Sequence, residues 1–188
     1  MGYFLTREDF NWIITLEDLD RLTASTDSVW QNALASKIEV MSSYMRFRYD
    51  VSEIFSSVED WDILLSWPIG ARVISGGAHY VSAQAVPVST LITDLNYWTP
   101  RDSRNQELVE IASYLTLHKI SGRPNSIGVN EDLLNRFNYS MKSLELIRDG
   151  VKDMDIPLLP ATEDGTDLTG DGFIPVSAEE AINRTYTI

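Results

Sequence analysis

Two amphipathic segments in the second half of the chain constrain the fold most, because each ends at residues that stop a helix. In both segments apolar residues recur at the three- and four-residue spacings that give an α-helix one buried face. The two stripes are Leu108, Ile111, Ala112 and Leu115 within 104–120, and Leu134, Phe137, Met141, Leu144 and Ile147 before Gly150. Pro157 and Pro160 follow Gly150, which favours an end to helical structure there. The sequence therefore predicts a helical pair from which the C-terminus departs.

Further helices are predicted in the first half of the chain. Short helices are expected over 7–12 and 16–22, and a long one begins at about residue 27. The apolar stripe of the long helix is Trp30, Leu34, Ile38, Met41 and Met45. The expected N-caps of all these helices are Thr6 (with Asp9 in a capping box), Thr15, Thr26 or Asp27, Asp102 or Ser103, and Asn130.

Residues 70–98, between the long helical segments, have a pattern typical of strands and turns. β-Branched and aromatic residues are separated there by Gly76, Gly77 and Pro87, which predicts a β-hairpin or small meander. A segment of about thirty residues rarely folds alone, so we expect an insertion in a helical domain. The predicted fold is mainly α: a small bundle of about four helices over 1–160, with a β-hairpin insertion at 70–98.

Composition describes an acidic globular chain without thiol chemistry. The 188 residues carry a net charge of −13 and include no cysteine, so disulfides and thiolate metal sites are excluded. The N-terminus lacks the apolar run of a signal peptide, and no apolar segment reaches the roughly 18 residues of a membrane span. We therefore expect a soluble protein made in a reducing cytoplasm, with no membrane association. The charge also argues against a protein that grips nucleic acid.

The acidity is concentrated towards the C-terminus. The segment from Asp149 to Ile188 contains nine acidic residues and two basic ones. Residues 161–188 are predicted to form an acidic linker and an extended C-terminal arm that becomes apolar again from Phe173. Such a segment suits a tether that becomes ordered on binding.

Residues with catalytic or metal-binding potential are few. His79 and His118 do not have metal-ligand spacing, and we interpret His118 as a cation near a helix C-terminus. A partial calcium-loop pattern starts at Asp167, but its twelfth position is Ala178 where a bidentate Glu is required. A flexible acidic linker explains that segment better. The sequence predicts no cofactor, no metal site and no catalytic residue.

Two arginine-aromatic groups have two interpretations each. Arg46 and Arg48 stand among Tyr44, Phe47 and Tyr49 at the end of the first long helix. They either complement the helix dipole or lie on a subunit interface, where Arg and Tyr are favoured. Arg101 and Arg104, which follow Tyr97 and Trp98, have the same two interpretations.

Four motifs resemble the head–tail connector (adaptor) proteins of tailed bacteriophages. They are "MSSYMRFRYDV" at the end of a long helix, "NYWTPRDSRNQELVEIASYLTLHKI", "RFNYSMKSLELIRDG" and "IPLLP". Within these and the N-terminus, the residues that match are Tyr3 to Asp9 at the start, Tyr44, Arg48 and Tyr49 at the helix end, Asp102 to Arg104, and more loosely Arg136, Tyr139, Ser143 and Ile147. The resemblance covers residues 3–160, and the inserted segment "GGAHYVSAQAVPVSTLITDLNYW" (76–98) is similar to versions from phages of Bacteroidetes, such as crAss-like phages.

This resemblance implies a structural protein of the virion, assembled in the host cytoplasm and located at the head–tail interface. It implies a ring of about twelve copies that binds the portal, offers a docking surface to the tail and extends the DNA channel. DNA would pass without specific binding, because an acidic wall repels phosphates. The residues expected on the portal are Phe173, Ile174, Val176 and Tyr186. Those expected between neighbouring subunits are Arg46, Arg48, His79, Tyr80 and Trp98.

Two other classes of function remain open. One is a monomeric acidic binding module, such as a scaffold or inhibitor that mimics nucleic acid, which would need no ring. The other is a hydrolase that uses clustered carboxylates such as Glu59, Asp60 and Asp62. No substrate is predicted for such an enzyme.

Overall fold

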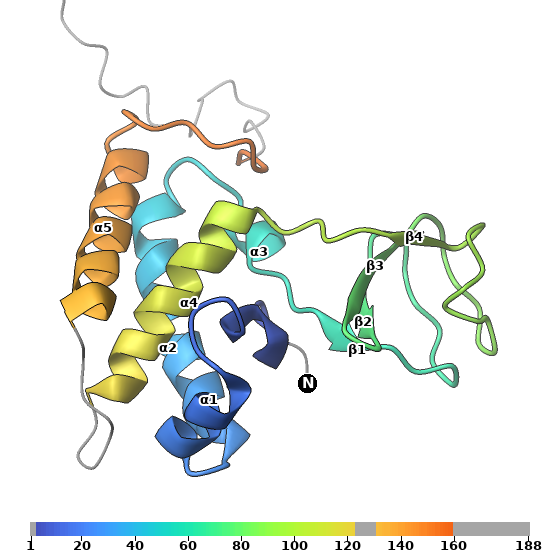
Figure 1. Cartoon of the computed structure of the whole chain (residues 1–188). Helices are drawn as coiled ribbons and strands as arrows, with labels where there is room; N and C mark the ends of the chain where they lie inside the picture. The colour runs from blue at the N-terminus through green and yellow to red at the C-terminus, as the bar shows by residue number, and fades with distance from the viewer. Residues whose placement is uncertain (1–2, 123–130, 160–188) are drawn as a thin grey trace, which may run out of the picture.

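A helical bundle and a smaller β-sheet lie beside each other in the computed structural model of the chain, which describes residues 3–122 and 131–159 (Figure 1). The helices are the 3-10 helix η1 (Arg7–Phe10) and the α-helices α1 (Leu16–Thr23), α2 (Asp27–Met45), α3 (Val51–Ile54), α4 (Gln106–Ser121) and α5 (Glu131–Arg148). The strands are β1 (Glu59–Asp60), β2 (Arg72–Ser75), β3 (Ala78–Ser82) and β4 (Trp98–Pro100). Among the described helices, none has the length and apolar character needed to cross a bilayer.

Helices α2, α4 and α5 pack against one another, and α4 is the central one. Every predicted stripe residue of α4 is buried, but so are Ser113, Tyr114 and Thr116 on its other faces. The reason is that η1 and α1 contact α4 in addition to α2 and α5. The sequence predicted an amphipathic helix here, and the structure makes it a core helix covered nearly all round.

The other two predicted stripes are confirmed in most positions. In α2, Trp30, Leu34, Met41 and Met45 are buried and Ile38 packs against the same core. In α5, Leu144 and Ile147 are buried and Phe137 and Met141 pack at the edge of the core. Leu134 is 43% exposed, and Leu133 packs against the core in its place. The prediction for Leu134 is therefore wrong by one position.

The helix ends follow local hydrogen bonding. The Thr6 N–H donates to the Asp9 carboxylate at 2.6 Å in the predicted capping box, and Thr15 Oγ1 accepts from the Asp18 N–H. Helix α4 is capped by Asn105, whose Oδ1 accepts from Leu108 N, and not by Asp102 or Ser103. Gly150 ends α5 with φ of 70°. The predicted cap Asn130 lies outside the described residues.

The sheet is larger than the predicted insertion. Strand order is β1-β2-β3-β4, with β1 parallel to β2 and the other pairs antiparallel. The hairpin of β2 and β3 is confirmed: Ser75 pairs with Ala78 across Gly76 and Gly77, which both have positive φ. Because β1 and β4 extend the sheet over 59–100, the protein is mixed α and β, and the prediction of a mainly α fold is wrong in this respect.

The bundle and the sheet have separate hydrophobic cores. The bundle core gathers residues of η1, α1, α2, α4 and α5, whereas the sheet core consists of Trp67, Val73, Val86 and Trp98. Two chain segments join the parts: 55–58 leads into β1, and 101–105 leads from β4 to α4 (Figure 1). The sheet therefore projects from the bundle as an arm with a core of its own.

Candidate interaction surfaces

Two long loops cover the end of the sheet that points away from the bundle (Figure 1). They are residues 61–71, between β1 and β2, and residues 83–97, between β3 and β4. Trp67 and Val86 exchange two backbone hydrogen bonds of 2.9 and 2.8 Å, and Ser89 N donates to Ile63 O at 2.7 Å. Trp67 and Trp98 pack edge to face beneath the loops with ring centroids 6.4 Å apart. The loops are thus held together as one structure.

These loops expose an unusual share of the large apolar side chains. The exposed ones are Leu64 (75%), Leu65 (48%), Ile69 (70%), Val88 (57%), Leu91 (58%) and Leu95 (72%), and we call these six residues the tip. Of the six, Leu65 also lines the space between the sheet and the bundle. They are half of the twelve large apolar side chains exposed in the described residues. Single exposed apolar residues are ordinary, but a group on one projecting element is typical of a surface that a partner covers.

A second apolar surface lies where α2 and α5 end. Phe47 is 67% exposed, Val151 75% and Leu158 53%, and we call these three residues the bundle-end patch. Backbone hydrogen bonds from Asp50 N to Pro157 O and from Leu159 N to Arg48 O attach the segment after α5 to the end of α2. The patch belongs to the bundle and shares no residue with the tip.

Arg104 connects the N-terminus, the sheet and α4 at the base of the arm. Its side chain is 1% exposed, and its Nη1 donates to Asp9 at 2.6 Å and to Phe4 O at 2.8 Å. Its Nη2 donates to Asp9 at 2.9 Å and to Asp102 at 2.7 Å. The His79 Nε2 on β3 lies 3.0 Å from Nη2 and, because a guanidinium offers no acceptor, must be the acceptor there. Arg104 is therefore an internal junction.

The electrostatics of this junction agree with that geometry. Burial would raise the pKa of Asp102, but the hydrogen bonds from Arg104 outweigh burial and lower this pKa from 3.8 to about 2. Burial would lower the pKa of Arg104, and the bonds to Asp102 and Asp9 raise it instead. Burial and the charge of Arg104 lower the pKa of His79 below 6.5, which keeps the imidazole neutral at pH 7.

The depressed pKa of Asp102 predicts a loss of stability in acid. The unfolded chain binds this proton near pH 3.8 and the folded chain only near pH 2, so the stabilisation is complete above about pH 5 and is lost as the pH falls towards 2. Asp102→Asn should weaken the decline of unfolding free energy with acid between pH 5 and 2.5, measured by urea titration at each pH. Asp60→Asn, at an exposed carboxylate of β1, should leave the decline unchanged. Equal pH dependence of Asp102→Asn and wild type would contradict the assignment.

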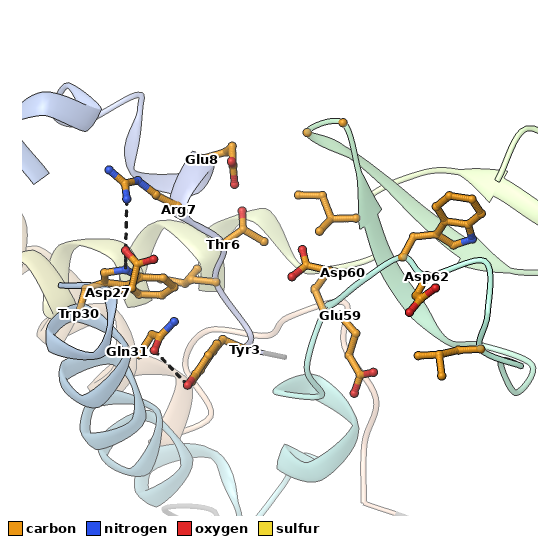
Figure 2. A pocket seen from close by; sticks show the side chains of 17 residues that line it. Tyr3, Thr6, Arg7, Glu8, Asp27, Trp30, Gln31, Glu59, Asp60 and Asp62 are labelled. Carbon is orange, nitrogen blue, oxygen red and sulfur yellow. Dashed lines mark hydrogen bonds and ion pairs between the residues drawn. The ribbon is translucent and has the colours of Figure 1, made fainter. Parts of the chain in front are cut away.

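An acidic cleft of about 700 Å³ separates the bundle from the sheet (Figure 2). Tyr3, Asp27 and Trp30 lie on the bundle side, and Glu59, Asp60 and Asp62 on the sheet side. The one basic side chain of its lining is Arg7, which pairs with Asp20 and, at 3.2 Å, with Asp27.

The carboxylates that the hydrolase hypothesis requires do not converge. Figure 2 shows Glu59, Asp60 and Asp62 pointing in different directions. Among the described residues, no group of three His, Cys, Asp or Glu residues could hold a metal ion. The cleft therefore supplies negative potential, and its geometry does not favour acid–base chemistry by these three residues.

The residues predicted between subunits occupy different environments. Arg46 lies beside the exposed ring of Phe47, with the guanidinium 5.6 Å from its centroid. Arg48 pairs with Asp153 of the same chain at 2.7 Å. His79 and Tyr80 are half-buried in β3, and Trp98 is fully buried in the sheet core. Trp98 therefore supports the arm from inside and is not presented at the surface, whereas Arg46 is.

Other predicted residues are placed as follows. His118 lies in the last turn of α4, as predicted, and its ring stacks on Phe137 at 3.9 Å. Burial and nearby Lys37 lower the pKa of His118, which disfavours the cationic form that the interpretation assumed. The portal residues Phe173, Ile174, Val176 and Tyr186 and the partial calcium loop from Asp167 lie outside the described residues.

Comparison of the chain with protein-family models, curated proteins and solved structures finds no match. The resemblance to head–tail adaptors stays a prediction from motifs. The sequence did not single out the tip, and it marked Arg104 as a helix-dipole or interface residue and not as an internal junction. The run of apolar residues at 63–69, interrupted by Ser66 and Pro68, was a usable signal for the tip. The internal role of Arg104 had no such signal, because Phe4, Asp9 and His79, which it contacts besides Asp102, are distant in sequence.

Proposed function

We propose that this chain is the subunit of an oligomeric adaptor ring that joins the portal of a tailed bacteriophage to its tail. The observation that carries the proposal is the projecting arm with six large apolar side chains exposed at its tip. Exposed apolar area of this kind costs free energy in water, roughly 25 cal/mol for each Å² that a partner could cover. A subunit whose partner is another protein explains that exposure better than a catalytic or monomeric role.

The acidic surface is compatible with this proposal. The ring would surround DNA, and a channel wall rich in carboxylates lets a phosphate backbone slide without adhering. The acidic cleft and the net charge of −13 also support a second candidate, a monomeric acidic module that binds a basic partner or mimics nucleic acid. The two candidates differ in assembly, because a mimic needs no ring and leaves the apolar tip without explanation.

Co-assembly with the candidate portal protein tests the proposal. Full-length chain mixed with portal should form rings on it, visible by electron microscopy and by particle mass. Truncation after Pro160 should weaken binding to the portal about tenfold or more if the C-terminal arm, 161–188, supplies apolar anchors. A variant in which Phe173, Ile174, Val176 and Tyr186 are all changed to Ser should show the same loss of portal binding. The control variant with Asp164→Asn and Asp167→Asn should bind normally. Stable rings formed by the truncated chain would contradict only the assignment of the portal-binding residues to the C-terminal arm. Absence of a ring with every form of the chain would favour the acidic module.

A further inference from the structure

We propose that, in the assembled ring, the tip of one copy packs against the bundle-end patch of the next copy. This inference rests on the proposed ring and names the two surfaces that close it. The tip is Leu64, Leu65, Ile69, Val88, Leu91 and Leu95, and the bundle-end patch is Phe47, Val151 and Leu158. Each surface belongs to a different part of the chain, and each is apolar without a cover within the described residues.

Two different patches favour a head-to-tail contact. When a tip binds a bundle-end patch, the first copy keeps a free patch and the second keeps a free tip, so further copies add in the same way until the ring closes. A contact of tip with tip would be self-complementary and would stop at a pair of copies. The division of the exposed apolar residues between arm and bundle therefore suits a head-to-tail contact, which gives a ring when the rotation between copies closes.

Charge complementarity identifies the same pair of surfaces. The tip loops contain Asp62 and Asp94 and no Lys, Arg or His. Each carboxylate accepts hydrogen bonds within its own turn through Oδ1, from Leu64 N at 2.8 Å and from Asn96 N at 3.0 Å respectively. Neither of them forms an ion pair within the described residues. Because Asp62 lines the cleft that faces the bundle, Asp94 is the carboxylate that can receive a cation from another copy.

The bundle-end patch offers such a cation. Arg48 and Arg148 are engaged by Asp153 at 2.7 Å and Asp149 at 2.8 Å. Arg46, next to Phe47, forms no ion pair within the described residues and contacts the Phe47 ring. The exposed Asp155 beside the patch also forms no ion pair within the described residues, so the charge complementarity rests on the pair of Arg46 and Asp94. Arginine beside an aromatic ring is a favoured interface composition.

The junction at Arg104 makes the contact directional. Since the arm meets the bundle through few segments, its direction depends on the bonds from Arg104 to His79 of β3 and to Asp9 beside the bundle. A buried bidentate arginine holds these elements in one relative orientation. A fixed arm angle gives every copy the same rotation to its neighbour, which is the condition for closure.

Complementation between two variants tests the contact. The tip variant carries Leu64→Asp and Leu95→Asp, and the patch variant carries Phe47→Asp and Val151→Asp. All four side chains are at least 67% exposed, so folding should be unaffected. Each variant alone should lose ring formation on the portal by about tenfold or more. A mixture of the two should give a dimer and no ring, because one intact tip and one intact patch remain. Tyr139→Asp, at a side chain of α5 that is 64% exposed and belongs to neither surface, is the control that should form rings normally.

Cysteine cross-linking gives an independent readout, because the chain has no cysteine of its own. Leu64→Cys combined with Val151→Cys should give, on oxidation, a ladder of linked copies up to the full ring. Either cysteine alone should give no linked species. Linked dimers from Leu64→Cys alone would show a tip-to-tip contact and overturn the proposal.

The outcomes separate this contact from the proposed function. If the tip variant or the patch variant still forms rings, the proposed contact is wrong and the proposed adaptor ring is unaffected. A mixture in which both variants stay monomeric overturns the head-to-tail pairing. A wild-type chain that forms no ring, alone or on the portal, overturns both.

Discussion

Replacing Arg104 with methionine is expected to lower the free energy of unfolding by about 3–5 kcal/mol, because it removes one partner of a buried ion pair. The change leaves the carboxylates of Asp9 and Asp102 without their cation and Phe4 O and His79 Nε2 without a donor. Urea denaturation followed by circular dichroism measures the loss. Methionine is close in length to the arginine stem, so a large cavity does not account for the effect.

Arg21→Met is the matched control for this prediction. Arg21 also pairs with two carboxylates, Asp18 at 3.2 Å and Glu17 at 3.6 Å, but its side chain is 62% exposed. Solvent screens such pairs, so the change should cost less than about 1 kcal/mol. Arg104→Lys should fall between the two, because it keeps the charge and loses the bidentate geometry. Equal losses for Arg104→Met and Arg21→Met would contradict the structural role of the junction.

Replacing Trp98 with alanine is expected to destabilise the arm by about 3–5 kcal/mol while the bundle stays folded. Trp98 is fully buried and packs edge to face on Trp67 in a core that is separate from that of the bundle. Its removal should open β2, β3 and the tip loops. Hydrogen exchange measures this: amides of β2 and β3 should lose protection, and those of α4 should keep theirs.

Leu95→Ala is the control in the loop that precedes β4, since Leu95 is 72% exposed and its truncation should change stability by no more than about 0.5 kcal/mol. Comparable loss of protection in α4 and in β3 of the Trp98→Ala variant would show that the two cores unfold as one. In that case the arm would not be an independently cored element.

Sequence periodicity and local stereochemistry determined the helices and the hairpin. The spacing of Trp30, Leu34, Met41 and Met45 requires a helix with one apolar face, and all four are buried. Gly76 and Gly77 between strand-forming residues require a tight turn, because both adopt positive φ. These features depend on neighbours within a few positions, so they could be read without knowing the fold.

Only the tertiary structure decided the sheet's extent and the burial of the polar residues. Strand β1 consists of Glu59 and Asp60, which have no apolar alternation and join the sheet because the backbone of β2 lies beside them. Asn105 and not Asp102 caps α4, because the carboxylate of Asp102 accepts hydrogen bonds from the buried Arg104.

The interaction surfaces follow the same division. The acidity of the chain and the prominence of Arg46 were evident from the sequence. The exposure of the tip was not evident, because the sequence does not distinguish a leucine in a core from a leucine at the end of the projecting sheet. Arg104 lies 95 positions from Asp9 and 25 from His79, and only the folded chain brings their charges within hydrogen-bonding distance. Long-range burial and pairing are properties of the packed molecule, and local sequence does not encode which distant partner meets which side chain.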